Sequence, residues 1–141
     1  EARRKREVLH QAMIDLEAAY TAPWKADSWA SNLLARLGGI ERAIREHAEE
    51  VESADGVIAR VLEDAPRLST AGEILVEDHA RMIDKTRQVT QLVQGLASPL
   101  DREVVGGVRD SVLELLGMIS LHRQRGANMV YEAYLVDIGE M

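Results

Sequence analysis

Four histidines are the residues of this chain whose type and spacing suggest chemistry, and they stand far apart in the sequence. Neutral imidazole is the commonest side-chain metal ligand, because one ring nitrogen carries a free lone pair near neutral pH. Carboxylates accompany the histidines, and Glu50 shares a helix face with His47, three residues earlier. The sequence therefore predicts a metal site whose ligands are His10, His47, His79, His122 and Glu50.

The elements that would position these histidines are four amphipathic helices. Apolar residues recur three or four positions apart, the period of a helix with one buried face, over about residues 3–20, 28–53, 70–97 and 101–134. Each segment carries one histidine. Short connections between four helices make neighbouring helices antiparallel. Residues 1–141 are therefore expected to form a single domain, an all-α, up-down-up-down four-helix bundle.

Local signals add detail to this bundle. Ser28 is a plausible cap of the second helix, and Thr70 with Glu73 fits a capping box at the start of the third. Residues 56–68 are expected to hold a short helical turn under one end of the bundle. Several glycines fall inside the helical pattern, where close helix packing would explain them: Gly38, Gly39, Gly106, Gly107, Gly117 and Gly126.

Helix rise tests whether the histidines can meet. At roughly 1.5 Å per residue, His47, His79 and His122 fall within about 5 Å of one level in an antiparallel bundle. His10 lies roughly 10 Å from that level unless the first loop folds back along the bundle. Three histidines are therefore expected to converge more readily than the fourth.

The sequences around the histidines resemble those of hemerythrin-like, or HHE cation-binding, domains over nearly the whole chain. The stretches are VLHQAMIDLEAAY, IREHAEEVE, VEDHARMID and LHRQRGANMVYEAY, around His10, His47, His79 and His122 respectively. The resemblance implies a four-helix bundle with non-heme iron held by histidines and bridging carboxylates. It also implies that the protein binds or senses O₂, nitric oxide or peroxide.

Three positions depart from the pattern of those domains, so the chain resembles a divergent member. Val51 stands where the family usually has Glu, Ile83 where it has a second histidine, and Ala127 where it has an acidic residue. A dinuclear iron site, a mononuclear one and no site therefore remain alternatives. Other carboxylates near the histidines are open as ligands: Glu52, Asp78 and Glu132.

The charged residues and the missing cysteines limit other functions. The net charge of −7 disfavours nonspecific nucleic-acid binding, which needs a basic surface. The basic stretch at residues 3–6 is expected to be a solvated first turn, with contact to an anion or an acidic partner as the alternative. Arg123 and Arg125 are expected to face solvent, with a role as counter-charges for site carboxylates as the alternative.

The compartment and the reaction class are less constrained by the sequence. With no cysteine, the chain has no disulfide or thiolate site, which fits the cytoplasm. No apolar run approaches the roughly 20 residues of a membrane helix. Hydrolase and phosphate-loop motifs are absent, so the sequence predicts no particular reaction.

Two alternatives to a non-heme metal protein remain. The first is a metal-free structural or interaction bundle acting through a partner or as a homodimer. Trp24 and Trp29 are expected to pack against the bundle end, with a role as exposed contact aromatics as the alternative. The second is a heme protein, with His122 as axial ligand and Gly126, one turn away, making room.

Overall fold

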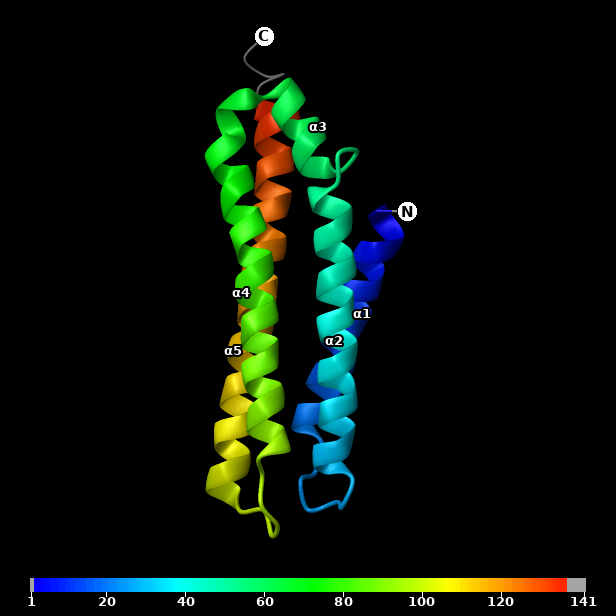
Figure 1. Cartoon of the computed structure of the whole chain (residues 1–141), viewed down its shortest axis with the longest axis vertical. Helices are drawn as coiled ribbons and strands as arrows, with labels where there is room; N and C mark the ends of the chain where they lie inside the picture. The colour runs from blue at the N-terminus through cyan, green and yellow to red at the C-terminus, as the bar shows by residue number, and fades with distance from the viewer. Residues whose placement is uncertain (1, 137–141) are drawn as a thin grey trace.

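The chain folds into four long antiparallel helices, which confirms the predicted all-α four-helix bundle (Figure 1). This is a computed structural model that describes residues 2–136, except the side chains of residues 2, 3, 5 and 136. No strand occurs among those residues. The long helices are α1 (Ala2–Thr21), α2 (Trp29–Glu52), α4 (Ser69–Gln94) and α5 (Arg102–Tyr131).

Shorter elements lie at one end of the bundle. The short helix α3 (Val57–Asp64) and the 3₁₀ turn η1 (Pro66–Leu68) cross the end of the bundle between α2 and α4, as predicted for residues 56–68. A π-helical turn, η2 (Glu132–Val136), follows α5. Within the described part of the chain, no helix is both long and apolar enough to cross a membrane.

The four long helices are not packed equally around the bundle. Helix α1 packs along α2, α2 along α4, and α4 along α5, whereas α1 meets α5 over only a short stretch. Both tryptophans pack near the first loop as expected, with Trp29 buried and Trp24 half-buried against the core. The side between α1 and α5 is therefore the least tightly closed.

Aliphatic side chains form two apolar clusters, and the histidines lie between them. The main core fills the bundle around Leu37 and Leu115, and the end cluster lies under α3 around Val61. On each of three helices, a histidine separates a main-core residue from an end-cluster residue. These series are Ile44, His47, Val51 on α2, Met82, His79, Leu75 on α4, and Ile119, His122, Met129 on α5.

One of the two local predictions about helix starts is wrong. Thr70 lies inside α4, and no capping box forms, because η1 runs directly into α4 and Leu68 takes the cap position. Ser28 does take the predicted N-cap position of α2, although its side chain makes no cap hydrogen bond. Asp101 does cap α5, since its carboxylate accepts a hydrogen bond of 2.8 Å from the Val104 amide.

The expectation that the six helical glycines mark close packing is also wrong. A Cβ atom added at any of them would meet no atom within 4 Å. The tightly packed helical glycine is instead Gly72, where a Cβ would lie 3.3 Å from Ile58 Cγ2. The helical period shows that a glycine lies in a helix, but it does not show how close the neighbouring helix comes.

Candidate metal centre

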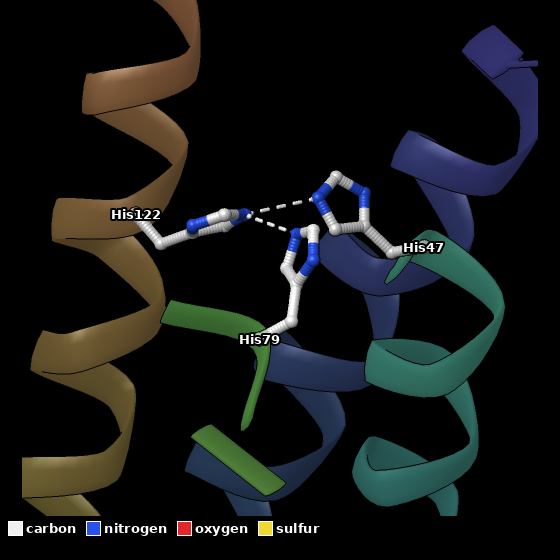
Figure 2. Close-up of side chains that lie close together, drawn as sticks. All are labelled: His47, His79 and His122. Atoms are coloured by element: carbon white, nitrogen blue, oxygen red, sulfur yellow. Dashed lines mark hydrogen bonds between the residues drawn. The ribbon is translucent and has the colours of Figure 1, made fainter. Parts of the chain in front are cut away.

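Three histidines from three helices bring their Nε2 atoms together inside the bundle (Figure 2). His122 Nε2 lies 3.1 Å from His47 Nε2 and 3.2 Å from His79 Nε2. All three ligand atoms lie within 4.8 Å of one another, and the residues are between 2% and 9% exposed. The expected common level of His47, His79 and His122 is therefore observed.

Carboxylates hold the far side of two of these rings. His122 Nδ1 lies 3.0 Å from Asp78 Oδ2, and His79 Nδ1 lies 2.8 Å from Glu52 Oε2. An ionised carboxylate can only accept, so each Nδ1 carries the hydrogen and donates it. In a neutral imidazole this leaves the lone pair on Nε2. Both rings are thus held as the tautomer that points a lone pair at the centre.

This tautomer assignment leaves an unsatisfied contact at the centre. A proton on His47 Nε2 can satisfy the 3.1 Å contact with His122. The 3.2 Å contact between His79 and His122 then joins two lone pairs with no hydrogen between them. A cation at the convergence point would remove this repulsion, either as a proton that makes one ring an imidazolium or as a metal ion.

Burial opposes the protonated alternative. Burial, together with positive charge on His122 and His79, lowers the pKa of His47 from 6.5 to about 3. Burial also lowers the pKa of His122, although its hydrogen bond to Asp78 acts in the opposite direction. His47 and His122 are therefore favoured in the neutral form at pH 7, the state in which imidazole binds metal.

Two of the three spacings between the nitrogens fit a small metal ion. Metal–nitrogen bonds of about 2.0–2.1 Å in a tetrahedral site place the nitrogens about 3.3–3.4 Å apart. Two of the three nitrogen pairs lie within about 0.3 Å of that spacing, and the third, between His47 and His79, lies within 4.8 Å. Three ligands leave at least one coordination position open, as in catalytic metal sites.

The other two predicted ligands do not join the three histidines. His10 is exposed on α1, and its Nδ1 lies 3.0 Å from an Arg123 guanidinium nitrogen. Its separation follows from the level mismatch already visible in the sequence. Glu50 lies on the wall of a cavity beside His47, but its carboxylate is not within the group of converging ligand atoms among the described residues.

The three carboxylates that the sequence left open as ligands have different contacts. Glu52 and Asp78 orient His79 and His122 as described above, whereas Glu132 lies in η2 and pairs with Arg67 at 3.7 Å. Arg125 donates a 2.8 Å hydrogen bond to Asp78 Oδ1, so the counter-charge alternative describes this arginine better than the expected solvent-facing one. Sequence spacing alone did not assign these orienting roles, because each contact joins different helices.

A cavity of about 660 Å³ opens beside the three histidines. His47 and His122 form part of its wall, together with residues of α1, α3 and the second half of α5. Gly126 also lies on this wall, and the space predicted beside it exists. However, His122 Nε2 faces the rings of His47 and His79 at 3.1 and 3.2 Å, so a heme bound to it would require these rings to move apart.

No family model matches this chain, and neither a curated protein nor a solved structure matches it. The resemblance to hemerythrin-like domains therefore stays a prediction from the sequence. What the site can do has to be inferred from its own geometry, namely three converging imidazoles, two orienting carboxylates and an adjacent cavity.

Proposed function

We propose that this protein binds one divalent first-row transition metal through the Nε2 atoms of His47, His79 and His122. Asp78 and Glu52 orient two of these ligands, and Arg125 holds Asp78 in place. Hydrogen bonds from a ligand imidazole to a carboxylate are typical of protein metal sites, where they fix the tautomer and raise the basicity of the ligand.

The observation that carries the proposal is the contact of 3.2 Å between His79 and His122. Both rings donate through Nδ1 to a carboxylate, so two lone pairs face each other in a buried place. An ordinary buried histidine would have a hydrogen-bond donor, not another lone pair, opposite its unprotonated nitrogen. A metal ion converts the repulsion into two bonds.

Iron is the metal that we propose, because imidazole ligands suit it and the resemblance to hemerythrin-like domains points to it. The histidine set favours a mononuclear site, since Asp78 and Glu52 are engaged with the rings rather than with the centre. With a coordination position open toward the cavity, the ion would bind or sense a small ligand such as O₂, nitric oxide or peroxide.

The test is metal binding by the purified, chelator-stripped protein. We expect one Fe²⁺ or Co²⁺ per chain under anaerobic conditions, and a metal at 100 times its dissociation constant should stabilise the fold by about 2.7 kcal/mol. His79→Gln should weaken binding at least tenfold. His10→Gln is the matched control and should bind as the unmodified chain does, because His10 lies outside the cluster.

A melting temperature that does not change with excess metal, together with no retained metal, would overturn the proposal. The metal-free interaction bundle would then be favoured if the protein also formed a stable dimer in solution. Equal loss of binding in His79→Gln and His10→Gln would instead place the metal outside the three-histidine cluster. Binding of Co²⁺ but not Fe²⁺ would keep the site and reject iron.

A further inference from the structure

The cavity beside the histidines has the size of a small-molecule site. Its volume of about 660 Å³ lies within the range of about 300–1,000 Å³ that is typical of ligand pockets. It lies where α1 and α5 diverge, and α3 lies over one end of it. This location leaves an entrance on the least tightly closed side of the bundle.

The lining of the cavity changes from apolar to cationic with exposure. Its buried wall contains His47 and His122. The other buried residues of the wall are apolar: Leu9, Val51, Leu75 and Met129. Its exposed members include three arginines, which come from three different helices: Arg6 from α1, Arg60 from α3 and Arg123 from α5. An occupant would therefore meet apolar groups inside and positive charge at the entrance.

Arginines outnumber carboxylates on the wall of this cavity. Glu50 is the one carboxylate among the described residues of the wall. Arg123 contacts His10 Nδ1 at 3.0 Å and Met13 Sδ at 3.8 Å. In a chain of net charge −7, a site with three arginines and one carboxylate stands out. Arg6 belongs to the basic stretch at residues 3–6, and the side chains of residues 3 and 5 lie outside the described residues.

We propose that this cavity binds an amphipathic carboxylate, with its apolar body against Leu9, Leu75 and Met129 and its carboxylate at the exposed arginines. Arginine guanidinium groups bind carboxylates through two parallel hydrogen bonds, which favours this head group over a neutral one. The inner end of the molecule would lie beside His47 and His122. Binding does not depend on a metal at the histidines, so it can be tested without one.

Calorimetry on the metal-free protein with straight-chain ligands tests this inference. We expect one decanoate per chain and an affinity at least tenfold higher than that of decan-1-ol, which has the same chain but no charge. Affinity should rise severalfold per methylene between hexanoate and decanoate, because each added CH₂ is buried against aliphatic side chains. These measurements separate the cavity from the metal site, since they are made with a chelator present.

Two pairs of variants locate the binding. Gly126→Leu should fill the cavity and abolish binding, and it is expected to fold because a Cβ there meets nothing within 4 Å. Gly117→Leu is its control, being the same change on the same helix outside the cavity. Arg60→Gln should remove most of the preference for decanoate over decan-1-ol. Arg36→Gln, at an exposed arginine elsewhere, should leave that preference unchanged.

Three results would overturn the inference. These are equal affinity for decanoate and decan-1-ol, several decanoates per chain as in adsorption to the surface, or unchanged binding in Gly126→Leu. Failure of metal binding in the separate experiment on the histidines would leave this result unaffected. If Gly126→Leu does not fold, a chain-length series with no increase in affinity from hexanoate to decanoate would reject the apolar cavity by itself.

Discussion

Replacing Asp78 by asparagine tests most directly whether the carboxylates orient the histidines for metal. The two carboxylate oxygens have separate tasks, since Oδ2 accepts from His122 Nδ1 at 3.0 Å and Oδ1 accepts from Arg125 at 2.8 Å. An asparagine of the same shape has one oxygen, so its amide NH₂ must face one of these two donors. A buried donor left without an acceptor costs about 1–3 kcal/mol.

The easiest relief for His122 is to move its hydrogen from Nδ1 to Nε2. That tautomer has no lone pair at the centre and cannot bind a metal there. We therefore expect Asp78→Asn to weaken metal binding by about 10- to 100-fold, or about 1.4–2.7 kcal/mol. Asp78 is only 5% exposed, so water cannot replace the lost acceptor easily, and the larger effect is expected.

The measurement is a competition titration of Co²⁺ or Fe²⁺ against a chelator of known affinity at pH 7. Glu77→Gln is the matched control, because Glu77 precedes Asp78 on α4 but its carboxylate lies on the surface, where it pairs with Arg81 at 3.3 Å. A metal affinity of Asp78→Asn within twofold of that of Glu77→Gln, in a protein of unchanged helicity, would refute the orienting role of Asp78.

Three further predictions follow from the same contacts and burial. Glu52→Gln should weaken metal binding less than Asp78→Asn does, by under about tenfold, because Glu52 is 38% exposed and water can replace it at His79; the same competition titration checks the order. Acid should destabilise the metal-free protein. The pKa of His47 is about 3 in the fold and 6.5 unfolded, so the unfolded chain binds the extra proton between these values, and the free energy of unfolding should fall by about 2 kcal/mol from pH 7 to pH 5 in urea titrations. A flat profile over that range would show that His47 is not buried in its neutral form. Gly107→Ala should stabilise the fold by about 1 kcal/mol in the same assay, because the added Cβ meets nothing within 4 Å, whereas Gly72→Ala should gain less because its Cβ would crowd a neighbour at 3.3 Å.

The helices and their buried faces were predictable because they depend on local spacing. The recurrence of apolar residues at three and four positions fixes which face of a helix avoids water, so the burial of Leu37, Ile44 and Leu115 follows from the pattern. The common level of three histidines followed as well, since helix rise is constant. The distance between neighbouring helices was not predictable, because it depends on the side chains of the facing helix. The six helical glycines that were expected at close contacts show this, since none of them lies at one.

The sequence by itself determined a four-helix bundle with one histidine on each long helix and three of them at one height. Only the tertiary structure decided that Glu52 and Asp78 bind the rings rather than the centre, and that a cavity opens beside them. The physical reason is that a ligand set depends on how helices are rotated about their axes and how far apart they lie. Both are set by packing among residues distant in the sequence, which the period of a single helix does not report.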